Sequence, residues 1–95
     1  MATVKIKYFG LLREIVGSRE EGLVIDDKLG ASEIIKLLAE KHKGRFSDFV
    51  FEKDGKLRSG FAYAVNGSTV SESKLPSIKC SSVQEFVILP PISGG

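Results

Sequence analysis

Apolar and polar residues alternate in several short stretches of this chain, as they do in strands with one buried face. Residues 3–9 place Val4, Ile6 and Tyr8 on one face, and two lysines and Phe9 on the other. The same alternation or short apolar runs predict further strands over residues 22–26, 61–65, 68–70 and 85–89. The first and last strands are the most apolar, which favours adjacent positions at the centre of a sheet.

Apolar residues at helical spacing predict two helices between these strands. Residues 11–16 predict a short helix that ends at Gly17. Residues 31–43 have one apolar face and one charged face, which predicts a longer amphipathic helix that ends at Gly44. Residues 46–51 are also rich in apolar side chains and fit either a helical turn or a short strand.

Turn signals complete the predicted fold. Asn66-Gly67 is typical of a two-residue hairpin, and the polar residues 71–82, interrupted by Pro76, predict a loop. Two helices cannot cover both faces of such a sheet. We therefore predict an α+β fold with about five strands in a mixed sheet and the helices on one face. The domain spans residues 1–89, and residues 90–95 form a flexible C-terminal tail.

Composition narrows the class of protein. The 95 residues are 42% hydrophobic and 27% charged, which predicts one soluble domain. No apolar run approaches the roughly 20 residues of a membrane span, and the first residues lack the apolar segment of a secretory signal. The net charge of +2 is spread along the chain and gives no reason to expect nucleic acid. A single cysteine fits a reducing, cytoplasmic setting.

The residues after the last strand carry the strongest functional signal. They are Pro90, Pro91, Ile92, Ser93, Gly94 and Gly95. Two prolines end the pairing of the sheet and stiffen the exit from it. Six residues span at most roughly 20 Å, which is long enough to enter the active site of another protein. Two glycines can pass through a narrow channel because they have no side chain.

A C-terminal carboxylate on such a tail suits two related reactions. A free carboxylate is a poor acyl donor, but transfer to AMP gives a mixed anhydride with a good leaving group. A sulfur nucleophile then leaves a thiocarboxylate on Gly95, and an amine instead leaves an amide. Neither reaction needs an acid, a base or a metal from this chain.

Three segments resemble the small subunit of molybdopterin synthase. They are VKIKYFGLLRE at residues 4–14, VNG at residues 65–67 and FVILPPISGG at residues 86–95. The resemblance covers most of the chain and is weakest over residues 46–59 and 71–84. Within the latter segment, residues 75–83 lack the acidic, glycine-containing turn that family members usually have there.

The resemblance implies a ubiquitin-like β-grasp fold and the role of a sulfur carrier. An E1-like enzyme would use ATP to adenylate Gly95, and a sulfur donor system would convert it into a thiocarboxylate. The large subunit of the synthase would receive the tail and pass the sulfur to a cyclic pyranopterin, which forms the dithiolene of molybdopterin. This chain would bind no cofactor and no metal itself, and the catalytic side chains would belong to the large subunit.

The resemblance also suggests three positions for docking to partners. Phe9 lies on the lysine-bearing face of the first predicted strand and serves either as an exposed anchor or as a core residue under a helix. Leu89 precedes the prolines and fits a partner-facing position or the core equally well. Thr69 matches a third, commonly apolar position, although threonine is a poorer anchor.

Two residues with reactive side chains have simpler interpretations. Cys80 has no basic neighbour in sequence to lower its pKa, which favours a structural role over a sulfur relay. His42 lies near the end of the long predicted helix, where a cation suits the helix dipole. No second metal ligand accompanies it, which argues against a metal site.

Other functions share the same tail chemistry. They are sulfur carriage for tRNA thiolation or for thiazole synthesis, and attachment to lysines as a ubiquitin-like modifier. Thiazole carriers are generally shorter and lack the long segment between the helix and the hairpin. A β-grasp binding module with an inert tail is a fourth alternative.

Overall fold

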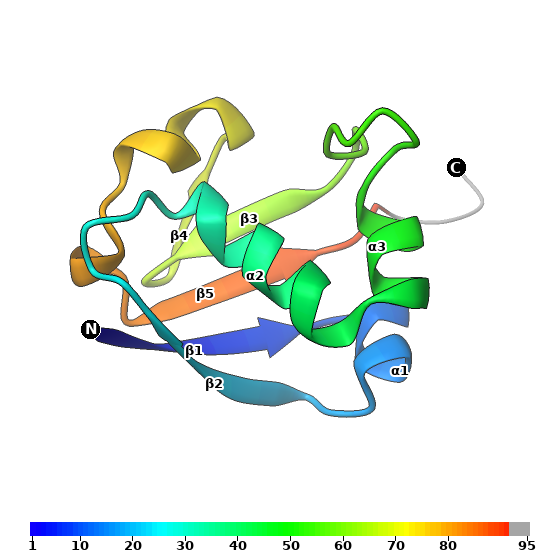
Figure 1. Ribbon diagram of the computed structural model, residues 1–95, viewed down its shortest axis with the longest axis horizontal. Helices are drawn as coiled ribbons and strands as arrows, with labels where there is room; N and C mark the ends of the chain where they lie inside the picture. Colours follow the sequence, from blue (N-terminus) through cyan, green and yellow to red (C-terminus); the bar gives the residue numbers. More distant parts are fainter. Residues whose placement is uncertain (92–95) are drawn as a thin grey trace.

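Five strands form one mixed sheet in the order β2-β1-β5-β3-β4 (Figure 1). The computed structural model describes residues 1–91. The strands are β1 (Ala2–Tyr8), β2 (Glu20–Ile25), β3 (Ala62–Val65), β4 (Ser68–Val70) and β5 (Glu85–Leu89). The central strands β1 and β5 run parallel, and the other neighbouring pairs are antiparallel. The predicted sheet and its two central strands are confirmed.

Three helices lie between the first three strands in the sequence. Figure 1 shows α2 lying across one face of the sheet. They are α1 (Leu11–Val16), α2 (Ser32–His42) and α3 (Gly44–Val50). The core forms between this face and the helices because strand and helix present apolar side chains to each other. Its fully buried members include Ile6, Ile34, Leu38, Phe46 and Phe86. No helix among residues 1–91 has the length and hydropathy needed to cross a membrane.

The prediction that Gly44 ends the long helix is wrong. Lys43 caps α2 with φ of +52°, its backbone N–H donates to Ala39 O at 2.8 Å, and Gly44 already begins α3. Two successive residues with positive φ turn the chain sharply between the two helices. Residues 46–51 are thus helical up to Val50, because Phe46 and Val50 lie one turn apart and are both buried.

The prediction of a plain loop over residues 71–82 is also wrong. The segment contains two 3₁₀ helices, η1 (Glu72–Ser77) and η2 (Cys80–Ser82). Leu75 and Cys80 are fully buried and hold this otherwise polar segment against the core. Backbone bonds also join it to the loop before α2, from Ala31 N to Ile78 O at 2.7 Å and from Cys80 N to Leu29 O at 2.8 Å.

The hairpin prediction at Asn66-Gly67 is confirmed, with φ of +51° and +86° at the two residues. The Asn66 side chain does more than form the turn. Its Oδ1 accepts from the backbone N–H of Gln84 at 2.8 Å and of Glu85 at 3.0 Å, and its Nδ2 donates to Ser82 O at 2.8 Å. One side chain therefore joins the β3–β4 turn to the start of β5.

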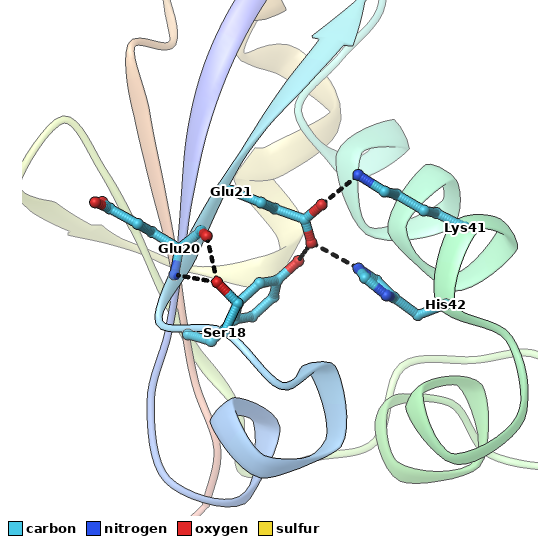
Figure 2. A network of polar contacts seen from close by, with 6 residues as sticks. Ser18, Glu20, Glu21, Lys41 and His42 are labelled. Atoms are coloured by element: carbon cyan, nitrogen blue, oxygen red, sulfur yellow. Dashed lines mark hydrogen bonds and ion pairs between the residues drawn. The ribbon is translucent and has the colours of Figure 1, made fainter.

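A polar cluster joins β2 to the C-terminal end of α2 (Figure 2). The Glu21 carboxylate accepts hydrogen bonds from Tyr8 Oη and Lys41 Nζ, and its Oε2 lies 2.6 Å from His42 Nε2. Burial by itself raises the pKa of Glu21, but the three hydrogen bonds outweigh it and lower the pKa below its usual value. His42 therefore contacts a specific partner, Glu21, in addition to having the favourable position at the helix end that the sequence predicted.

Candidate functional site

The parallel pairing of β1 and β5 brings two distant segments to one end of the sheet. Tyr8 lies opposite Ile88 in the ladder, so the residues that follow each strand emerge side by side. Phe9 follows β1, and Pro90 follows β5. Figure 1 shows α1 and α3 at this same end, where the chain leaves the sheet. The fold therefore places the start of the tail beside the apolar residues that follow β1.

An open apolar pocket of about 470 Å³ surrounds this exit. It is lined by Phe9, Gly10, Leu11, Phe49, Leu89, Pro90 and Pro91. Phe9 and Leu11 remain 40% and 42% exposed and lie together in this pocket, and such a contiguous exposed apolar patch is typical of an interaction site. The pocket unites two of the three predicted docking positions, Phe9 and Leu89, with the first two residues of the tail.

The three predicted docking residues differ in how deeply the structure buries them. Phe9 is not buried under a helix, and the Arg13 guanidinium lies 5.3 Å from its ring centroid. Leu89 is half-buried and points away from the core face that Ile88 occupies. Thr69 is exposed on β4, two strands from β5, which is about 10 Å across the sheet. Thr69 is therefore not part of the pocket.

Charged groups lie on the face of the sheet that the helices leave open. Lys7 Nζ is 3.2 Å from Glu85 Oε2, and Lys5 Nζ is 3.9 Å from Glu20 Oε2. These pairs are largely exposed, so each contributes little to folding stability. The open face thus changes from charged near its middle to apolar where the tail leaves.

The predicted reactive end of the tail lies outside the described residues. The reacting residue is Gly95, and the tail-insertion residues Ile92, Ser93 and Gly94 lie outside the described residues with it. Pro90 is half-buried in the pocket wall and Pro91 is exposed at its rim. The structure therefore describes the root of the tail and leaves the chemistry at Gly95 as a prediction.

Three residues of this site went unnoticed in the sequence, namely Phe49, Gly60 and Phe61. The Phe49 and Phe61 rings pack edge to face at 5.4 Å between centroids. An added Cβ on Gly60 would lie 3.0 Å from Pro91 Cβ, so this glycine is in close contact with the tail. Two phenylalanines and a glycine before β3 are visible in the sequence as candidates for packing. Only the tertiary structure shows that the two rings pack on each other and that the glycine contacts Pro91.

Cys80 is fully buried in η2 and does not line the pocket at the tail root. Its thiol donates to Gly30 O at 3.5 Å, and burial raises the pKa of the thiol. A raised pKa keeps the sulfur protonated and unreactive, which fits the structural interpretation of this residue. No group of three or more potential metal ligands occurs within the part of the chain that the structure describes.

A mixed five-stranded sheet that wraps α2, with the tail leaving its central strand, defines a ubiquitin-like β-grasp protein. Residues 6–95 match the ThiS family, and the chain therefore belongs to this family of ubiquitin-like sulfur carriers. No curated protein matches the chain.

Solved structures support the same fold. SAMP1 from Haloferax volcanii is 25% identical with a TM-score of 0.81, and the match covers 99% of this chain and 100% of that one. A Pyrococcus furiosus protein assigned as subunit 1 of the molybdopterin converting factor is 23% identical with a TM-score of 0.70, over 97% of this chain and 100% of that one.

A third structure shows a relative with a partner. One chain of the Amycolatopsis orientalis BexX/CysO complex is 21% identical to this chain with a TM-score of 0.55. The match covers 97% of this chain and 99% of that one. This protein of similar fold was thus solved in a complex of BexX and CysO.

Proposed function

We propose that this chain is the sulfur-carrying small subunit of a molybdopterin synthase. The observation that carries the proposal is the tail itself. Pro90 and Pro91 leave a central strand beside an exposed Phe9, and the sequence continues to Gly94-Gly95. The segments 4–14 and 86–95, which resemble the small subunit, are the two that meet at this pocket. The resemblance and the arrangement in space thus support the same role.

The chemistry proceeds in two balanced steps. The Gly95 carboxylate attacks the α-phosphorus of ATP on an E1-like partner, which forms the acyl adenylate and releases pyrophosphate. Hydrosulfide from a sulfur donor system then attacks the acyl carbon. The carbon–sulfur bond forms, the carbon–oxygen bond to AMP breaks, and the products are the thiocarboxylate and AMP. The chain supplies the Gly95 carboxylate, and we expect it to bind no cofactor of its own.

The large subunit would receive the loaded tail and transfer its sulfur to a cyclic pyranopterin. The pocket residues would remain at the mouth of that partner, with Phe9 and Leu89 as contact residues. We place this chemistry in the cytoplasm, because a reducing compartment preserves a thiocarboxylate and suits the single thiol of this chain.

The test is the intact mass of the chain after incubation with its E1-like enzyme, ATP and a sulfur donor. The expected gain equals the replacement of one oxygen by one sulfur, and deletion of Gly95 abolishes it. The loaded chain is then mixed with the large subunit and the cyclic pyranopterin. Formation of molybdopterin supports the specific role, whereas stable sulfur loading without product restricts the chain to another sulfur carrier.

A ubiquitin-like modifier is the second candidate, and the similarity to SAMP1 from Haloferax volcanii favours it. In that case an amine of a target lysine displaces the activated acyl group, and an amide forms. New lysine-linked adducts of the chain in host extract, together with no sulfur gain, would decide for this alternative.

The docking role of Phe9 has its own test. Phe9→Ala removes an exposed ring from the pocket, and Val24→Ala is a matched control because Val24 is 61% exposed on the edge strand β2, opposite Thr3 at the other end of β1. We expect Phe9→Ala to weaken binding to the large subunit about tenfold, while Val24→Ala changes it less than about twofold. Equal affinities for the two variants would remove Phe9 from the interface.

A further inference from the structure

Two glycines flank the prolines at the root of the tail, and they differ in how much space they leave. An added Cβ on Gly10 would lie 3.6 Å from Pro90 Cγ, which is an ordinary contact. An added Cβ on Gly60 would lie 3.0 Å from Pro91 Cβ and 3.5 Å from Pro91 Cγ. Gly60 is therefore the position at which the space beside the tail is already full.

The sheet itself sets Gly60 against Pro91. In the antiparallel ladder of β3 and β5, Ala62 lies opposite Leu89. The same register continued by two residues in each strand places Gly60 opposite Pro91. The neighbouring Phe61 ring packs on Phe49 of α3 and holds this end of the loop to the helices. The contact is thus a consequence of strand register and of aromatic packing, and no contact outside this chain is required for it.

We propose that Gly60 is a positioning residue that directs the tail. Its missing side chain lets Pro91 lie against the segment before β3, and this contact fixes the position of Pro91, the residue from which the tail continues. The inference rests on the proposed function, in which the tail must enter the active site of an activating enzyme. It adds Gly60, which lies outside the three segments that resemble the small subunit.

A small displacement of Pro91 changes the point from which the tail leaves the domain. A Cβ at 3.0 Å pushes Pro91 by a few tenths of an ångström. The proline ring fixes φ, so ring and backbone move together. Residues 92–95 join Pro91 to the reacting carboxylate of Gly95, so a displaced Pro91 changes the point from which the tail enters the active site of the activating enzyme. A misplacement of about 1 Å at a reacting group costs up to about 100-fold in rate.

The test compares Gly60→Ala with Gly55→Ala in the full chain. The two glycines have nearly the same φ, +93° and +89°, so alanine meets the same backbone strain at both. Gly55 has nothing within 4 Å of an added Cβ, so its variant lacks the contact with the tail. The measured reaction is ATP-dependent adenylation of the chain by its E1-like enzyme, followed as pyrophosphate release over a range of carrier concentrations.

We expect Gly60→Ala to lower kcat about tenfold at an unchanged KM, because the domain docks normally and only the tail is misdirected. Gly55→Ala changes both parameters less than about twofold. Pro91→Gly removes the atoms that the new Cβ would meet, so adding Gly60→Ala to Pro91→Gly lowers kcat no further. The NMR signals of Pro90 and Pro91 in the isolated chain shift in Gly60→Ala and stay in place in Gly55→Ala.

The outcomes separate this inference from the proposed function. If the wild-type chain forms no acyl adenylate, the proposed function fails, whatever the variants do. If the wild type is active and the two alanine variants have equal kcat, the positioning role of Gly60 is overturned while the carrier function stands. A raised KM at unchanged kcat in Gly60→Ala would also overturn it, because that result makes the residue a docking contact.

Discussion

The polar cluster around Glu21 yields a prediction about folding stability that the structure makes quantitative. The change is Glu21→Gln, which keeps the shape of the side chain and removes its charge. The Glu21 side chain is only 14% exposed, and its partners range from the fully buried Tyr8 to the half-exposed Lys41. The bonds to the buried partners therefore carry most of the free energy.

The magnitude follows from the three hydrogen bonds. Glutamine still accepts from Tyr8 Oη, but it loses the extra strength of a charged acceptor, at about 1 kcal/mol. The interaction with His42, whose side chain is 19% exposed, contributes about 1 kcal/mol more. The bond from Lys41 adds little, because half of that side chain is in water. We expect Glu21→Gln to lower the free energy of unfolding by about 2 kcal/mol at pH 7.

The pH dependence of this loss gives a second, independent readout. The pKa of Glu21 is lowered in the folded state, so its carboxylate contributes stability above the usual carboxyl range. That contribution disappears as the pH falls below the usual carboxyl range and through the lowered folded-state pKa. Wild type and Glu21→Gln should therefore differ in full at pH 7 and converge towards pH 3.

Urea denaturation at pH 7 and at several values down to pH 3 measures both quantities. Glu20→Gln is the matched control, because Glu20 is the neighbouring carboxylate and makes only an exposed ion pair with Lys5. We expect it to change stability by less than about 0.5 kcal/mol at any pH. A loss below about 0.5 kcal/mol in Glu21→Gln, or a difference that stays constant with pH, would refute this account of the cluster.

Three further changes test other parts of the fold. Asn66→Ala removes three hydrogen bonds that join the hairpin to β5, and we expect a loss of about 2–3 kcal/mol in urea denaturation. Gly30→Ala places a Cβ 2.3 Å from Pro76 O, so we expect a loss of at least about 2 kcal/mol or a failure to accumulate as folded protein in expression trials. Cys80→Ala should lower the melting temperature by a few degrees and leave sulfur loading of Gly95 unchanged, since the thiol is buried and its pKa raised; lost loading at normal folding would make Cys80 a relay.

The central part of the fold was predictable because short-range rules govern it. Val4, Ile6 and Tyr8 alternate with polar residues and are all fully buried. Asn66-Gly67 has the positive φ values that a two-residue hairpin requires. In both cases the information lies within a few neighbouring residues, and nothing in the tertiary structure opposes it.

The errors arise where tertiary contacts decide the backbone. Lys43 adopts a positive φ, which lysine does not signal, because the chain must turn between two packed helices. Leu75 and Cys80 fold a polar segment into 3₁₀ turns by burying two isolated apolar side chains. Neither feature has a periodic pattern that would predict it.

The candidate site was predictable only in part for the same reason. Phe9, Leu89 and the prolines are each visible in sequence, and the parallel pairing of β1 and β5 brings them together. The contact between Gly60 and Pro91 depends on the register of β3 against β5 and on the packing of Phe61. No local rule connects these residues before the strand order is known.

The parallel pairing of the two central strands also has a consequence for how the chain folds. Lys5 pairs with Glu85, and these residues are 85 − 5 = 80 positions apart. During synthesis β1 therefore waits for almost the whole domain before its central neighbour exists, and such long-range pairing is slow. Until then one edge of β1 remains open to pairing with other chains. A truncation that reaches into β5 should expose this edge and cause aggregation, whereas one that stops after Leu89 should leave a folded domain.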